Sequence, residues 1–186
     1  MLVLNEINYG PLTGLIGDWE GNKGMDVAPD PEGEEHNPYF ETLSYTAIGD
    51  VTNAEKQTLA VLHYRQRVSR IADGEVFHDQ TGYWMWDATT DTIMHSFTIP
   101  RAVAVLAGGF HAVDDDVVTI DVTAGIDDPD WQIVQSPFMK RNARTIAFVQ
   151  QLILDGDSLN YRQTTMVEIY GDVHEHTDDN VLTRKK

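Results

Sequence analysis

A period of two residues runs through most of the chain and constrains its fold more than any other feature. Polar and apolar residues alternate over 115–125, and residues 57–68 and 75–87 are rich in residues that favour strands. Side chains of a strand alternate between its two faces, so this pattern indicates sheet rather than helix. The segment 145–171 indicates a hairpin about the turn DGDS. Several such segments separated by short turns predict an all-β sandwich or barrel.

Three segments interrupt this pattern. We expect a short helical turn at 11–17 (PLTGLIG) and a lid or a long connection at 125–142, which contains two prolines. The segment 26–40 holds three of the seven prolines together with several acids, and it predicts a loop. Since no internal repeat or linker is visible, we expect one domain over 1–186, with its barrel over about 12–182.

Composition narrows the classes of function. The chain has 186 residues and a formal charge of −17, which disfavours nucleic-acid partners and anionic membrane surfaces. It has no cysteine, so disulfides, thiolate metal sites and a cysteine nucleophile are excluded. The segment MLVLNEINYG carries neither a basic region nor a long apolar run, so we expect no secretion signal and a cytoplasmic location. The sequence leaves a homodimer open.

Trp19 lies between glycines in LIGDWEGNKG, just before an extended segment. In a barrel, a large flat side chain at this point would close one open end and bury about 150–250 Å² of surface. Gly17 and Gly21 would let the backbone bend and approach closely. An ordinary core tryptophan beside turn glycines is the alternative.

LIGDWEG, FHDQTGYWMWD and a histidine-bearing last strand occur here in the order found in nitrobindin-like proteins, which the chain resembles over roughly 10–182. In detail it is similar to a bacterial branch, through NPYFETL, GEVFHDQTGYW and HTDDNVL. The family pattern GxWxGxG is one residue longer here, because Trp19-Glu20-Gly21 is followed by Asn22-Lys23-Gly24. The resemblance implies a single closed antiparallel β-barrel of about ten strands, lipocalin-like or fatty-acid-binding-protein-like, with a short N-terminal helical plug.

The resemblance also implies a cofactor, haem b. The axial iron ligand of the family is a histidine near the end of the last strand, which favours His176 in HEHTDDN, with His174 as the fallback. His78 corresponds to a family histidine that faces the haem. The second ring nitrogen of the ligand needs a partner, for which Asp178 or Asp179 is available. The implied function is binding of nitric oxide, or isomerisation of peroxynitrite to nitrate, at a ferric haem.

Other interpretations of these residues stay open. HEHTDDN is also compatible with a solvated tail, or with a zinc site made by His174, His176 and one aspartate, although a third ligand of definite spacing is missing. We expect His63 at the rim, His95 in the core, and His36 and His111 exposed. Haem propionates would need cations at the mouth, for which the candidates are Arg65, Arg67, Arg70 and Arg101.

Three rival functions remain. The same barrel could carry a fatty acid or another small apolar or planar ligand without catalysis, and its aromatic residues suit either ligand: Tyr83, Trp84, Trp86 and Phe97. Carboxylates crowded at Asp127, Asp128 and Asp130 would suit a hydrolase, although such clusters are commonly solvated faces. A purely structural interaction domain is the third.

Overall fold

The computed structural model describes residues 7–186, so the first six residues of MLVLNEINYG, the segment predicted to lack a secretion signal, lie outside it. The described residues contain only two short helices, η1 (Gly10–Leu15) and α1 (Pro137–Asn142). Their strands are β1 (Gly17–Asp30), β2 (Gly33–Asn53), β3 (Gln57–Arg70), β4 (Val76–Asp87), β5 (Thr92–Ile99), β6 (Val103–Asp114), β7 (Val117–Gly125), β8 (Ile133–Gln135), β9 (Arg144–Asp155), β10 (Ser158–Ile169) and β11 (Asp172–Arg184).

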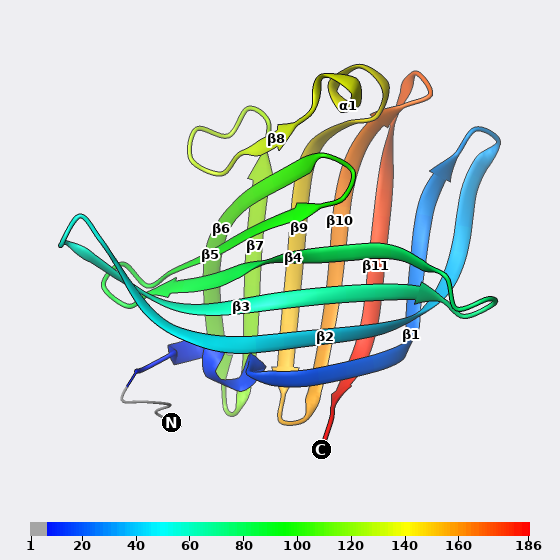
Figure 1. The fold of residues 1–186 in the computed structure, drawn as a ribbon. Coiled ribbons are helices and arrows are strands. Elements are labelled where there is room, and N and C mark those ends of the chain that lie inside the picture. The colour runs from blue at the N-terminus through cyan, green and yellow to red at the C-terminus, as the bar shows by residue number, and fades with distance from the viewer. Residues whose placement is uncertain (1–6) are drawn as a thin grey trace.

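Ten of these strands close into an antiparallel barrel (Figure 1). β1 pairs with β2 on one side and with β11 on the other, which joins the two ends of the chain. The ring is completed where β5 pairs with β6, and short β8 adds to β6 outside the ring. The all-β closed barrel of about ten strands predicted from the sequence is confirmed.

One end of the barrel is closed by η1 and Trp19. The indole is fully buried, and its Nε1 donates a hydrogen bond to the Leu15 carbonyl at 2.8 Å. The Arg184 guanidinium lies over the ring, 4.1 Å from its centroid. Gly17 begins β1 with a φ of +126°, a conformation that favours glycine. The predicted short helical plug is confirmed as η1, and Trp19 belongs to the buried core cluster, which agrees with both interpretations of this residue.

The prediction of a loop at 26–40 was wrong, because this segment is the hairpin that joins β1 to β2. Its prolines lie where a missing N–H does little harm: Pro31 is in the turn and Pro29 is paired next to it. Pro38 lies opposite Met25, beside the irregularity in the register between Gly21 and Gly24. Prolines at a hairpin tip and beside a bulge do not stop a strand.

The segment 125–142 is a long connection, as expected. It contains β8 and α1, and the Ser136 hydroxyl caps α1 by accepting a hydrogen bond from the Met139 N–H. This segment and the β10–β11 turn lie at one end of the barrel, while η1 and the C-terminus lie at the other (Figure 1).

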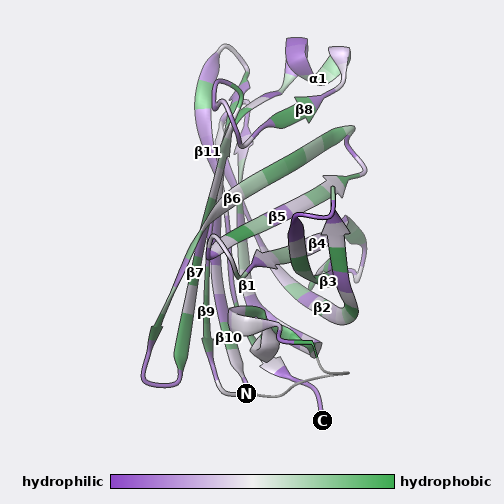
Figure 2. Ribbon diagram, turned by 90° about the vertical axis from the view of Figure 1, so that its left-hand side faces the viewer, coloured by the Kyte–Doolittle hydropathy of each residue, from purple (hydrophilic) through white to green (hydrophobic). Residues whose placement is uncertain are grey.

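The core fills the closed end of the barrel. Apolar and polar residues alternate along most strands, as the colouring of Figure 2 shows. The largest fully buried side chains include Trp19, Trp84 and Phe148. Within residues 7–186, no helix has the length and apolar character needed to cross a membrane.

Candidate functional site

A cavity of about 390 Å³ opens at the end that carries α1. This volume falls within the range of about 300–1,000 Å³ typical of small-molecule sites. Met139 and Ala143 from the long connection contribute to its lining, as do Pro29 and Glu35 from the β1–β2 hairpin. The cavity thus lies between the plugged end and the connection, and every strand of the ring except β7 adds to its wall.

One wall of the cavity is apolar and aromatic. Phe97 from β5 packs against Phe148 from β9, with ring centroids 5.1 Å apart. Phe77 from β4 and the valines Val103 and Val105 from β6 continue this surface. Such a wall suits a flat apolar ligand.

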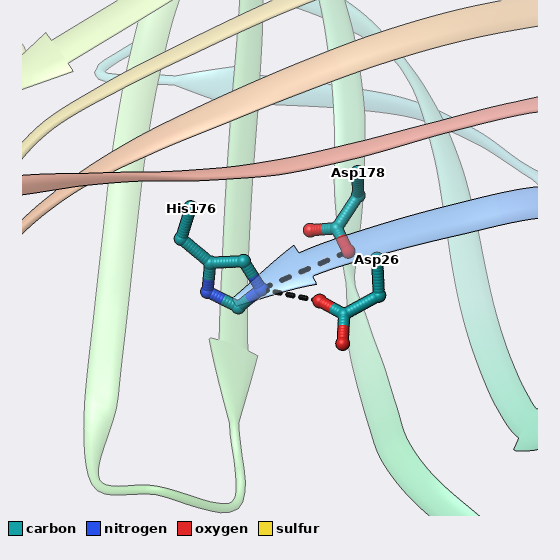
Figure 3. Close-up of side chains that lie close together, drawn as sticks. All are labelled: Asp26, His176 and Asp178. Carbon is teal, nitrogen blue, oxygen red and sulfur yellow. Dashed lines mark hydrogen bonds and ion pairs between the residues drawn. The ribbon is translucent and has the colours of Figure 1, made fainter. Parts of the chain in front are cut away.

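The polar wall is dominated by His176, which β11 directs into the cavity beside Asp26 and Asp178 (Figure 3). The imidazole Nε2 lies 2.6 Å from Asp26 Oδ1 and 3.8 Å from Asp178 Oδ1. Asp26 comes from β1, at the opposite end of the chain, and is 5% exposed. The three donor atoms lie within 4.8 Å of one another.

Burial and charge act against each other in this group. Burial alone would lower the pKa of His176, but the hydrogen bond with Asp26 and the charges of both aspartates raise it above its ordinary value. Burial would raise the pKa of Asp26, and the bond and charge of His176 lower it. For Asp178 burial prevails, and its pKa rises to about 7. These shifts favour a protonated His176 beside an ionised Asp26.

Below this group lies a buried carboxyl, Glu41, which is fully inaccessible to solvent. It accepts hydrogen bonds from Gln66 at 2.7 Å, Tyr161 at 2.9 Å and Asn180 at 2.8 Å. Burial raises its pKa, and these three bonds only partly oppose that effect. Tyr161 also reaches the cavity lining, so Glu41 braces the polar wall from behind.

The structure separates the three histidines proposed for the cofactor. His176 and His78 both line the cavity, and His78 Nε2 lies 3.2 Å from Gln80 Oε1. Burial lowers the pKa of His78. His174 shares the inward face of β11 with His176, yet it packs edge-on against Tyr170 and forms no part of the lining. The assignment of His176 as the iron ligand stays a prediction.

The remaining histidines lie away from the cavity. His95 is fully buried, stacks on Trp84 at 3.9 Å and pairs with the Tyr64 hydroxyl at 2.7 Å, as expected of a core residue. His63 pairs with Thr81 on the outer surface rather than at the mouth. His36 is exposed as expected. His111 is not, because its side chain is only 15% exposed.

Two of the four candidate arginines reach the cavity, Arg70 and Arg101. Arg65 and Arg67 instead lie on the outside of β3 and pair with Asp79, at 2.6 and 3.8 Å. The aspartates proposed for a hydrolase also lie outside the cavity. Among them, Asp128 accepts the backbone N–H groups of Asp130 and Trp131, an ordinary turn arrangement.

The family model described as "THAP4-like, heme-binding beta-barrel domain" matches residues 8–184, nearly the whole chain. The chain belongs to this THAP4-like family. Among solved structures, it is similar to Rv2717c from M. tuberculosis, with 21% identity, a TM-score of 0.70, and coverage of 94% of this chain and 95% of that one. That likeness supports the fold alone. No curated protein matches the sequence.

Within this THAP4-like barrel, sequence reasoning missed Asp26. It was assigned to a loop, so its pairing with the last strand could not be foreseen. Asp178 was considered as a partner for the imidazole, and it is the nearer inward residue, whereas Asp179 faces outward and is exposed. The nearest signal was the family's first-strand motif, which ends at Gly24, two residues before Asp26.

Proposed function

We propose that the chain binds haem b in its cavity, with His176 as the axial ligand of a ferric iron. The observation that carries this proposal is the imidazole that the last strand presents to the cavity, opposite an aromatic and apolar wall. Membership of the THAP4-like family supports it. The donor set fits the group, since a neutral imidazole is a strong axial ligand and the aromatic wall accepts a flat ring.

His176 would have to change its bonding to serve in this way. Its Nε2 is engaged by Asp26, so ligation through that atom requires the aspartate to withdraw and the imidazole to lose a proton. Asp178 lies close enough to hold the ring in orientation afterwards.

The mouth offers a partner for the propionates. Arg70 is already paired with Asp73 and Glu75, which favours Arg101 for this role. When bound, ferric haem would supply an iron with a free sixth position, which suits nitric oxide binding or isomerisation of peroxynitrite to nitrate. His78 and the aromatic wall line the same cavity and would limit the access of water to the bound group.

Titration with hemin tests the proposal. We expect a Soret band of one equivalent, which is lost in His176→Ala and kept in His174→Ala and in the exposed control His36→Ala. Loss of the band in His174→Ala alone would move the ligand to His174. If wild-type protein takes up no hemin at all, the proposal fails. Peroxynitrite decay and nitrate yield are then measured on the loaded protein and on His176→Ala.

A second candidate function is a carrier of a fatty acid or another apolar ligand without catalysis. It is favoured by the engagement of the His176 Nε2 with Asp26, which leaves the apolar wall as the main binding surface. A fluorescent fatty acid should then bind with equal affinity to wild type and His176→Ala. Replacement of Phe97 by aspartate should abolish that binding, and no effect of this replacement would exclude the cavity as the site.

A further inference from the structure

A row of polar side chains crosses four neighbouring strands at the level of His176. Asn37 on β2 lies opposite Asp26 on β1, Asp26 lies opposite Asp178 on β11, and Asp178 lies opposite Gln163 on β10. All four side chains line the cavity. Two carboxylates are thus direct cross-strand neighbours inside the barrel, flanked on both sides by amides.

The amides orient the two carboxylates. Asn37 Nδ2 donates to Asp26 Oδ2 at 3.2 Å, and Gln163 Nε2 donates to Asp178 Oδ2 at 3.4 Å. Each aspartate therefore has its outer oxygen held, while its Oδ1 is turned toward His176 Nε2. Metal ligands in proteins are commonly oriented by such second partners.

Two carboxylates face a single imidazole in this group. If both were ionised they would be withdrawn from water and would repel each other across the paired strands, which is why the pKa of Asp178 is raised to about 7. The imidazole can offset at most one of the two aspartates. A divalent cation between the carboxylates would offset both and leave the imidazole neutral.

We propose that Asp26, His176 and Asp178 bind one divalent first-row transition metal ion, of the zinc class, without haem. An imidazole and two carboxylates form a donor set that such ions accept, and a fourth position remains toward the cavity for water or a ligand. The third ligand that HEHTDDN lacks comes from the first strand, and His174 is not needed.

The required movements are small. Around a tetrahedral zinc ion with bonds of about 2.1 Å, ligand atoms lie about 3.4 Å apart. The Nε2 to Asp26 Oδ1 separation of 2.6 Å must therefore widen by about 0.8 Å, and the 3.8 Å separation to Asp178 must shorten by about 0.4 Å. Rotations of the side chains supply such shifts without moving the strands. This site goes beyond the proposed function, and the two ligands exclude each other because both need the same nitrogen.

Cobalt and zinc serve as probes. Protein treated with a chelator is titrated with Co²⁺, read from its visible ligand-field absorption, and with Zn²⁺ in a calorimeter. We expect one ion per chain, with affinity reduced at least tenfold in Asp26→Asn and in Asp178→Asn. Asp179→Asn, the outward neighbour on the same strand, should bind as wild type, and so should His174→Ala. Circular dichroism and thermal unfolding confirm that each variant folds.

Hemin titration of the same samples separates this proposal from haem binding. Asp26→Asn should lose the metal and keep or strengthen hemin binding, because the competitor for Nε2 is removed, while His176→Ala should lose both. The metal site is overturned if wild type binds no Co²⁺ or Zn²⁺, or if Asp179→Asn weakens binding as much as Asp26→Asn. Metal binding without any Soret band would end the haem proposal alone.

Discussion

His95 provides a quantitative test of how the closed end of the barrel depends on pH. The ring is fully buried between Trp84 and the Tyr64 hydroxyl. Burial lowers the pKa of His95 from 6.5 to about 3, so the folded protein keeps it neutral while the unfolded chain protonates it below pH 6.5. We expect His95→Phe, which retains a flat ring of similar size, to remove this dependence.

The size of the effect follows from linkage between protonation and folding. Between the unfolded and folded pKa values the unfolded chain binds the additional proton, so stability falls as the pH falls, by about 1.4 kcal/mol per pH unit. Integrated from pH 7 to pH 4.5 this amounts to about 2.5 kcal/mol, and over the whole shift to about 5 kcal/mol. The raised pKa values of Asp178 and Glu41 act in the opposite direction, but they are common to both proteins.

Urea denaturation at pH 7, 5.5 and 4.5 measures the free energy of unfolding of wild type, His95→Phe and the exposed control His36→Ala. The stability of His95→Phe relative to wild type should improve by about 2.5 kcal/mol between pH 7 and pH 4.5. At pH 7 the free energies of unfolding of the two proteins also differ because the variant lacks the hydrogen bond to Tyr64. This difference does not depend on pH, so it cancels when the change with pH is compared. If the two proteins lose stability in parallel, His95 titrates normally, and the burial argument is wrong.

Three other perturbations test the packing, each by chemical denaturation. Glu41→Leu removes the carboxylate that accepts from three buried donors and should cost about 3 kcal/mol or more, although Gln66 and Tyr161 each keep a second partner. Glu41→Gln should remove the fall in stability with rising pH that a buried carboxyl of raised pKa produces. Gly82→Ala places a Cβ against the Ser96 carbonyl across β4 and β5 and should cost about 1–3 kcal/mol or more, whereas Gly125→Ala, with no atom nearer than 3.7 Å, should be far milder. Arg184→Ala removes the cation over the Trp19 ring and two donors to backbone carbonyls, and should lower the free energy of unfolding by about 2 kcal/mol. For any of these variants, an unchanged denaturation midpoint would contradict the importance of the contact concerned.

Much of the barrel could be predicted because its signals are local. Alternation and short turns marked most strands, and the glycine-flanked Trp19 marked the plug. The prediction for 26–40 failed because it was based on proline content, which is a local property of the sequence. Whether Pro38 is tolerated in a strand depends on an irregularity in the partner strand. Neighbouring strands overrode the propensity of the segment.

The candidate site could be predicted only in part, for a related reason. His176 and His78 were found because the family resemblance marked them, and both line the cavity. Asp26 became visible only through the register between β1 and β11, a property of two segments about 150 residues apart. Arg65 was wrongly proposed for the mouth of the barrel. The alternation of residues along a strand shows which side chains share a face, but it does not show which face is inside.

The pairing of β1 with β11 has a consequence for biosynthesis. As the chain leaves the ribosome, β1 can pair with β2 as soon as β2 has been synthesised. Its other edge stays unpaired until β11, the last strand, has emerged. The binding pocket therefore cannot form before synthesis of the chain is complete. Truncation by a premature stop would leave an unpaired strand edge that favours aggregation, in place of a closed barrel of lower stability.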